Sequence, residues 1–215
     1  MKKDLRTKLW YASGLLIAFI LWTILICYVD RQAIGPQDSI VGFATINRFV
    51  HNLTGTHMQL YTITDWLSVV PVGIMMCFAA LGLFQWIKRR KFKDVDYNIL
   101  ILGGFYLVVM GAYILFEMIP INHRPVLIEG FLEVSYPSST TMLVMCVMPT
   151  AMMQLRLRMK QGYFRTLLLV LIALFIVFMV IGRLISGVHW LTDIVGGTLL
   201  SLGLVILYNF FVNLK

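Results

Sequence analysis

Six apolar runs, each long enough to cross a membrane as a helix, set the main constraint on how this chain of 215 residues can fold. The hydrocarbon core of a bilayer is about 30 Å thick, and about 20 apolar helical residues span it. Because backbone N–H and C=O groups find no water there, such runs must be helical. The sequence therefore predicts an all-α integral membrane protein with six transmembrane helices, at 9–29, 66–87, 98–119, 138–155, 166–185 and 190–211.

The composition agrees with one membrane domain. Hydrophobic residues make up 60% of the chain and charged residues 13%, whereas soluble domains contain about 25% charged residues. The net charge of +8 is compatible with nucleic-acid binding, but the basic residues are dispersed at the ends of the apolar runs. Membrane topology explains them better, so we expect residues 1–215 to form a single membrane domain that binds no nucleic acid.

Lysine and arginine gather in the loops on one side of the predicted helices. The loops on this side contain Lys2, Lys3, Arg6, Lys8, Lys88, Arg89, Arg90, Lys91, Lys93, Arg156, Arg158, Lys160 and Arg165. The opposite side contains Arg31, Arg48, Arg124 and Arg183. Since basic loops stay in the cytoplasm, both termini are predicted to be cytoplasmic and the second group of loops to face outside.

The one long loop, residues 30–65, lies on the predicted outer side. An apolar face with helical spacing follows Asp38 and ends at Gly55; its members are Ile40, Phe43, Ile46, Phe49, Val50 and Leu53. This pattern predicts a helix that Asp38 caps and Gly55 ends. Such a helix could lie in the membrane interface and help to cover a site. A packed segment without lipid contact fits the same pattern.

The three cysteines, Cys27, Cys77 and Cys146, each fall inside an apolar run. The sequence contains no CxxC pair and no cluster of histidine and cysteine. We therefore expect buried thiols, and neither a disulfide nor a metal site.

Ionisable residues gather in 182–193, between the last two predicted helices. His189 and Asp193 are four residues apart, so on a helix they would share one face, and the carboxylate could accept a hydrogen bond from the imidazole. That bond would leave the other ring nitrogen free to attack. Arg183 precedes them across a turn at Gly187, and its planar guanidinium suits a phosphate. The alternative is a structural histidine beside an arginine that contacts lipid headgroups.

Two further pieces of sequence complete a recognisable set. Residues 117–125 are Glu-Met-Ile-Pro-Ile-Asn-His-Arg-Pro, and residues 137–140 are Pro-Ser-Ser-Thr. With 182–193, they resemble the three motifs of the type 2 phosphatidic acid phosphatase superfamily, which also includes vanadium haloperoxidases and glucose-6-phosphatase. The family motifs are Lys-x6-Arg-Pro, Pro-Ser-Gly-His and Ser-Arg-x5-His-x3-Asp. This chain departs from them at Glu117, Ser139, Thr140 and Gly182.

The resemblance implies a phosphatase that forms a phosphohistidine. His189 would attack the phosphorus, and Asp193 would stabilise the imidazolium. The phosphate oxygens would be held by Arg124, Arg183 and the start of the fourth helix, with Ser138, Ser139 and Thr140. The resemblance implies no metal and no cofactor.

Two of the departures bear on catalysis. Thr140 stands where the family has the histidine that protonates the leaving group, and a threonine hydroxyl is no comparable acid. His123 is the candidate substitute, although it is adjacent to Arg124 and consecutive side chains usually point apart. Glu117 replaces a lysine and should repel phosphate unless Arg124 or another cation neutralises it; a glutamate that faces water is the alternative.

The expected protein is a multi-pass cell-membrane phosphatase with its active site outside. Its favoured substrate is a polyprenyl diphosphate, such as undecaprenyl diphosphate, in the outer leaflet; phosphatidic acid or phosphatidylglycerophosphate is the next candidate. A non-catalytic relative that binds or transports phospholipids is the alternative from another class. The complete set of Arg183, His189 and Asp193 favours chemistry, and no paired halves indicate a transporter. Tyr136 and Trp190 are expected to be membrane-interface anchors.

Overall fold

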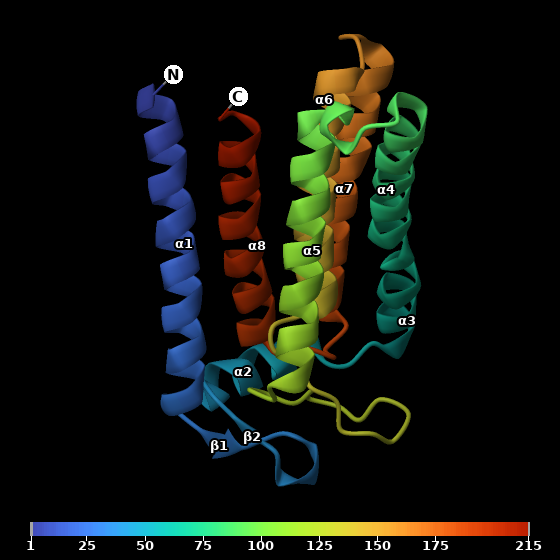
Figure 1. The fold of residues 1–215 in the computed structure, drawn as a ribbon. Helices are drawn as coiled ribbons and strands as arrows, with labels where there is room; N and C mark the ends of the chain where they lie inside the picture. The colour runs from blue at the N-terminus through green and yellow to red at the C-terminus, as the bar shows by residue number, and fades with distance from the viewer. Residues whose placement is uncertain (1, 215) are drawn as a thin grey trace.

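The computed structural model describes residues 2–214, apart from the side chains of Lys2 and Lys3, and it shows a bundle of long helices (Figure 1). Six helical segments among these residues are long and apolar enough to cross a membrane. They are α1 (Lys2–Tyr28), α3 followed by α4 (Met58–Leu67 and Val69–Arg89), α5 (Tyr97–Met118), α6 (Ser139–Arg158), α7 (Tyr163–Ile185) and α8 (Leu191–Val212). The predicted all-α membrane fold with six spans is confirmed.

Helices α6 and α8 form the inside of the bundle. In the most apolar stretch of each span, 56% of the residues of α6 and 50% of the residues of α8 are buried. The corresponding share is 6–28% in the other four spans. Helix α8 packs along α1, and α6 packs on both α7 and α8. Their inner faces supply Met142, Val147, Leu200 and Tyr208 to the core. Since two of the three motifs end at the first turns of these helices, the core fixes where the motifs lie.

The second span differs from the prediction. It begins at Met58, with α3, and a short break at Ser68 separates α3 from α4. Pro71 lies in the first turn of α4, and because proline has no N–H group it cannot continue the helical hydrogen bonds from α3. Helix α3 packs against α7, so residues expected in a loop are instead held on a helix.

The outer segment before α3 contains a hairpin and a short helix. Strands β1 (Gln32–Ala33) and β2 (Ile40–Val41) pair antiparallel around the 3₁₀ turn η1 (Pro36–Asp38), and α2 (Ala44–Thr54) follows. Asp38 was therefore wrongly predicted as the cap: it belongs to the hairpin turn, and Phe43 precedes the first helical residue. The predicted end at Gly55 is confirmed.

Helix α2 lies across the end of the bundle (Figure 1) and shows features of both predicted alternatives. One side packs inward, where the fully buried Asn47 donates to Thr192 Oγ1 of α8 at 2.9 Å. The other side leaves Phe49 and Leu53 63% and 70% exposed. This helix is therefore anchored to the start of α8, and its exposed aromatic and aliphatic face is free to contact lipid.

The cysteine prediction is correct only in part. All three thiols are free; Cys146 is buried, Cys27 is intermediate, and Cys77 is exposed. An outward-facing position on α4 explains Cys77, because a membrane helix presents apolar side chains to lipid as readily as to the core.

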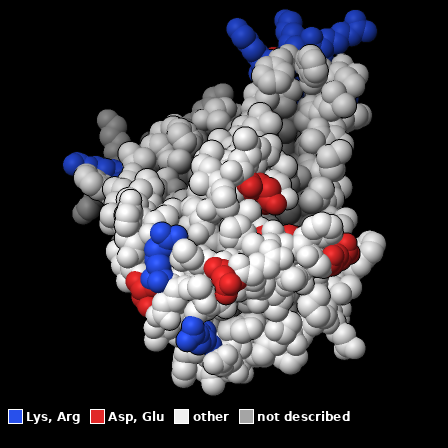
Figure 2. Space-filling view, turned by 90° about the horizontal axis from the view of Figure 1, so that it is seen from below, with Lys and Arg blue, Asp and Glu red and all other residues white. Residues whose placement is uncertain are grey.

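The two ends of the bundle differ in their content of charged residues. The chain termini lie together at one end (Figure 1), where α4 and α6 also end with their basic residues. The connection from α4 to α5 contains the short 3₁₀ helix η2 (Phe92–Asp94). Seen from the opposite end, the surface is mostly uncharged (Figure 2). This asymmetry agrees with the positive-inside rule, and the cytoplasmic location of the termini stays a prediction.

A pair of cysteine substitutions tests this topology. Thr56 and Lys91 are both exposed and lie at opposite ends of the bundle. In a variant that lacks the three native cysteines, we expect Thr56→Cys to react with a membrane-impermeant thiol reagent in intact cells. Lys91→Cys should react only after lysis. The reverse labelling pattern would place the end that carries Thr56 in the cytoplasm.

Candidate active site

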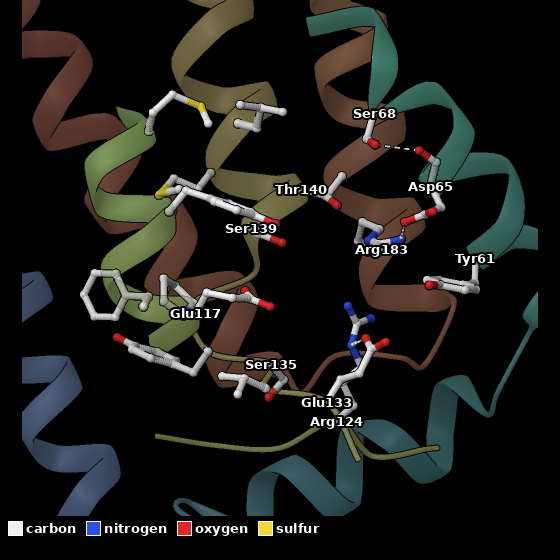
Figure 3. A pocket seen from close by; sticks show the side chains of 18 of the residues that line it. Tyr61, Asp65, Ser68, Glu117, Arg124, Glu133, Ser135, Ser139, Thr140 and Arg183 are labelled. Atoms are coloured by element: carbon white, nitrogen blue, oxygen red, sulfur yellow. Dashed lines mark hydrogen bonds and ion pairs between the residues drawn. The ribbon is translucent and has the colours of Figure 1, made fainter. Parts of the chain in front are cut away.

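A polar cavity of ≈ 620 Å³ lies at the end of the bundle away from the termini (Figure 3). Helices α3, α5, α6 and α7 and the loop between α5 and α6 contribute to its wall. The polar lining residues that matter for the chemistry are Tyr61, Asp65, Glu117, Arg124, Glu133 and Arg183. The cavity thus brings together residues from the first and third motifs with residues of α3.

The loop between α5 and α6 folds back on itself and presents Arg124. Ser135 N donates to Asn122 O at 2.9 Å, and Arg124 N donates to Glu133 O at 3.0 Å. These antiparallel bonds place Arg124 beside Glu133. Their side chains form an ion pair, with Arg124 Nε 2.9 Å from Glu133 Oε2.

Arg183 reaches the cavity from the last turn of α7. Its Nη1 lies 3.5 Å from Thr64 Oγ1 and 3.5 Å from Asp65 Oδ1, both on α3. The ring of Tyr61 lies beside both arginines, with Arg183 Cζ 5.1 Å and Arg124 Cζ 5.9 Å from its centroid. Cation–π attraction at these distances helps to hold the two guanidinium groups at one place.

Both guanidinium groups retain free donors. Arg124 is 8% exposed and Arg183 1% exposed. Arg124 Nη1 and Arg183 Nε are buried and have no hydrogen-bond acceptor among the described residues. A buried N–H group without a partner is costly, and an anion in the cavity would satisfy these donors. The cavity is therefore built to receive an anionic group.

The turn between α7 and α8 positions His189. Gly187 has φ +69°, and a Cβ atom there would lie 2.0 Å from Gly55 O. Only glycine fits this contact. Next to it, His57 N donates to Ser186 O at 2.9 Å, so the turn is fastened to the segment that joins α2 and α3.

His189 and Asp193 are brought together, as their spacing suggests. Nδ1 of His189 lies 3.6 Å from Oδ2 of Asp193, which is longer than a hydrogen bond, and both side chains are buried. Asp193 Oδ2 accepts from Trp190 N at 2.9 Å, so this carboxylate also caps the start of α8. Asn122 Nδ2 lies 3.5 Å from Asp193 Oδ1 and links the first motif to the third.

His189 and Asp193 do not line the cavity. Arg124, Ser135 and Arg183, which do line it, are close enough to His189 to influence its charge. Burial lowers the pKa of His189 well below its ordinary value, the positive charges of the two arginines lower it further, and the backbone of Ser135 opposes them. The imidazole is therefore neutral at neutral pH, which is the form that can act as a nucleophile.

The second motif is divided between two roles. Ser138, expected to contact phosphate, is fully buried and does not line the cavity; its Oγ instead accepts from Thr141 N at 3.5 Å and caps α6. Ser139 and Thr140 do line the cavity. In this structure Ser138 is not placed to contact a ligand in the cavity, because its hydroxyl serves the backbone of α6 at the N-cap position; its contact with phosphate stays a prediction.

His123, the candidate proton donor, is not among the residues that line the cavity. Its backbone pairs with Val134, and its carbonyl oxygen accepts from Trp190 Nε1 at 2.8 Å. None of the four histidines, all of which are among the described residues, lines the cavity. Glu117 does line it, but Arg124 forms its ion pair with Glu133 and does not neutralise Glu117.

Several site residues were missed from the sequence. Tyr61 and Asp65 fall within the predicted loop 30–65 but lie on α3, and their four-residue spacing fits one face of a helix. Glu133 is brought to Arg124 only by the fold of its loop, so no sequence pattern indicates it.

Tyr136 and Trp190 were wrongly predicted as interface anchors: they are 1% and 3% exposed. Tyr136 packs in the core, where its Oη is 2.7 Å from Thr23 Oγ1 of α1, and Trp190 donates from Nε1 to the carbonyl oxygen of His123.

Among residues 2–214, no group of three or more histidine, cysteine, aspartate or glutamate side chains is placed to bind a metal ion. A metal ion held by protein ligands alone is therefore not indicated in this part of the chain.

Comparison with known proteins adds a family and a fold. The model of the PAP2 superfamily matches residues 104–215. A crystal structure of a transmembrane PAP2-type phosphatidylglycerolphosphate phosphatase from Bacillus subtilis matches with a TM-score of 0.56 and 18% identity. The match covers 96% of this chain and 98% of that one, and it concerns the fold. No curated protein sequence matches this chain.

The environment of His189 predicts its titration. Since burial and two arginines oppose protonation, the imidazole should stay neutral as the pH falls through 6.5, its ordinary pKa, and gain a proton only at lower pH. Nitrogen-15 NMR of the histidine-labelled protein in detergent measures this, with His189→Ala to assign the signal. A midpoint at or above 6.5 would contradict the buried environment described for His189.

Proposed function

This chain belongs to the PAP2 superfamily of phosphatases, and we propose that it hydrolyses a polyprenyl diphosphate in the outer leaflet through a phosphohistidine intermediate. The family match confirms the resemblance drawn from the three motifs. Membership supports a membrane-bound lipid phosphatase, and the choice of lipid rests on the geometry of the cavity.

The observation that carries the proposal is the meeting of a cavity that holds two arginines with an apolar cavity. A second cavity, of ≈ 530 Å³, lies between α4 and α5 and is lined by side chains such as Met75, Leu83 and Leu107. Met110 lines both cavities. A lipid with its phosphate beside the arginines and its hydrocarbon chain beside α4 and α5 would occupy both cavities. The substrate should therefore be an amphiphile and not a soluble phosphate ester.

The arginines supply the electrostatic part of catalysis. Free N–H groups on Arg124 and Arg183 would bind phosphate oxygens, and the first turn of α6 adds backbone donors at Ser139 and Thr140. Phosphoryl transfer spreads negative charge over the equatorial oxygens of the phosphate. Hydrogen-bond donors that are already positioned around these oxygens therefore stabilise the transition state.

The chemical step belongs to His189. Its neutral ring nitrogen would form a bond to phosphorus while the bond to the leaving oxygen breaks, and the carboxylate of Asp193 would stabilise the positive charge that develops on the ring. Water then cleaves the N–P bond and releases phosphate. Since His189 lies behind the cavity wall in this conformation, substrate binding must bring the phosphate and the imidazole into contact.

The lack of a cavity histidine favours a diphosphate substrate. A lipid monophosphate must expel a strongly basic alkoxide, whereas a lipid diphosphate expels a phosphate monoester whose second pKa is about 6. Thr140 cannot protonate the alkoxide, but the phosphate monoester leaves without help. Phosphatidic acid and phosphatidylglycerophosphate are therefore expected to be poorer substrates than undecaprenyl diphosphate.

A non-catalytic lipid-binding role is the second candidate. The observations that favour it are Thr140 in place of an acid and the position of His189 behind the cavity wall. Catalysis and simple binding differ in what they require of His189, so substitution of this residue separates them.

We expect His189→Ala to lower phosphate release from farnesyl or undecaprenyl diphosphate by more than about 10⁴-fold, because it removes the nucleophile. Asp193→Asn should cost about 10²- to 10⁴-fold, since the attacking nitrogen remains but is poorly oriented. His57→Ala, an exposed histidine outside the cavity, is the matched control and should leave the rate unchanged. If His189→Ala retains activity while its melting temperature is normal, the residue is not the nucleophile.

The leaving-group argument is tested by substrate preference. The wild-type protein should hydrolyse polyprenyl diphosphate about 10²-fold or more faster than phosphatidic acid, a factor typical of general acid catalysis. Thr140→His should raise the rate on phosphatidic acid more than the rate on the diphosphate, with Thr140→Ser as control. Equal wild-type rates on the two lipids, measured on one preparation in detergent, would show that another residue supplies the proton.

A further inference from the structure

Helices α4 and α5 pack on each other, and the two cavities follow one another along the seam between them. On α4 the lining residues run from Ser68 in the polar cavity to Trp86 in the apolar cavity. On α5 they run from Glu117 in the polar cavity to Ile99 in the apolar cavity, and Met110 lines both. The lining positions recur every three or four residues, so they share one face of each helix. The two cavities together form one passage, the α4–α5 groove.

The α4–α5 groove is longer than one leaflet of a membrane. Glu117 and Ile99 are 18 positions apart, as are Ser68 and Trp86. At 1.5 Å of rise per residue, each helix lines the groove over about 27 Å. The hydrocarbon core of a bilayer is about 30 Å thick, so one leaflet accounts for about 15 Å of it. A chain that starts at the arginines and fills the groove therefore passes the middle of the membrane.

The apolar part of the groove has room for one hydrocarbon chain. Its ≈ 530 Å³ extend over the 11 positions from Met110 to Ile99, about 17 Å of helix, which gives a cross-section of about 30 Å². This area fits one chain and is too small for two. Gly103 and Gly104 line this part, and a Cβ atom at either position would meet no atom within 4 Å. The missing side chains thus leave space that a ligand can fill.

Two aromatic rings lie at the far end of the groove. Trp86 and Phe92 both line it, with their ring centroids 6.1 Å apart and their planes at 90°. Phe92 belongs to η2, in the connection from α4 to α5, so the pair lies where the two helices are joined. A chain that reaches this pair must end there or turn out into the bilayer.

We propose that the α4–α5 groove selects lipid diphosphates by chain length and binds a single polyprenyl chain longer than one leaflet. This proposal rests on the proposed function and names the feature of the substrate that the groove distinguishes. Affinity rises with each added prenyl unit until the chain reaches Trp86 and Phe92, and then stays constant. Because membrane lipid is as apolar as the groove, the gain comes from van der Waals contacts with α4 and α5 and not from removal of the chain from water.

A series of chain lengths provides the first test. Geranyl, farnesyl, geranylgeranyl and undecaprenyl diphosphates are compared at equal mole fraction in one detergent. For the wild-type protein, kcat/KM should rise by about 10-fold or more from geranyl to geranylgeranyl diphosphate, since tens of atomic contacts are added. It should rise much less from there to undecaprenyl diphosphate, because the groove is then full.

A filled groove should change this series. Gly103→Leu places a side chain about 21 Å along the groove from Glu117, so kcat/KM should level off at farnesyl diphosphate. Gly111→Leu is the matched control: it lies on the same helix, lines neither cavity, and its Cβ atom also meets no atom within 4 Å. This variant should keep the wild-type series.

The position of the chain end provides a readout that does not depend on turnover. In His189→Ala, a geranylgeranyl diphosphate analogue with a diazirine at its chain end is photolysed in lipid nanodiscs, and the adducts are mapped. We expect adducts on the halves of α4 and α5 that contain Trp86 and Ile99, and excess undecaprenyl diphosphate should suppress them.

Three results would each overturn the chain-length proposal. They are equal wild-type kcat/KM on all four diphosphates, the same series in Gly103→Leu and Gly111→Leu, and adducts spread over the lipid-facing sides of all six spans. Adducts at the expected place, in a protein that hydrolyses none of the diphosphates, would support the groove as a binding site and contradict the proposed function alone.

Discussion

Two buried guanidinium groups held beside one tyrosine ring are the arrangement on which the rest of the site depends. Arg124 comes from a loop and Arg183 from the last turn of α7, and like charges so placed repel each other. Glu133 and Asp65 offset this repulsion, with side chains that stay 42% and 53% exposed. The arginine side chains are only 10% and 1% exposed, and Arg124 Nη1 and Arg183 Nε stay free, so a phosphate can bind to these donors while the carboxylates keep their contacts.

The hydrogen bonds around Asn122 connect this anion site to the nucleophile. Gly42 N donates to Asn122 Oδ1 at 3.3 Å, and Asn122 Nδ2 reaches Asp193. One buried amide therefore ties the β-hairpin, the arginine loop and the start of α8 together. Such a network keeps the first and third motifs in register although they are far apart in the sequence, and it explains why the outer hairpin belongs to the site.

The sequence predicted the features that depend on long-range hydrophobic patterning and on local spacing. Apolar length identified the six spans, and a four-residue spacing brought His189 close to Asp193. Features set by tertiary contacts were not predictable in this way. Asp65 was missed because α3 extends the second span beyond its most apolar part, and Glu133 because a loop of irregular backbone carries it to Arg124. His123 and Ser138 do not line the cavity, although the motif pattern offers both for chemistry: the Ser138 hydroxyl caps α6, and the loop that carries His123 places Arg124 in the cavity wall.

The central claim is that His189 becomes phosphorylated during turnover. The most direct measurement is rapid denaturation of the protein during hydrolysis of farnesyl diphosphate labelled with phosphorus-32 at the terminal phosphate, followed by peptide mapping. Label on His189 that is stable in alkali and released in acid is the predicted result. Turnover with no label on His189, or with label on another residue, would contradict the account.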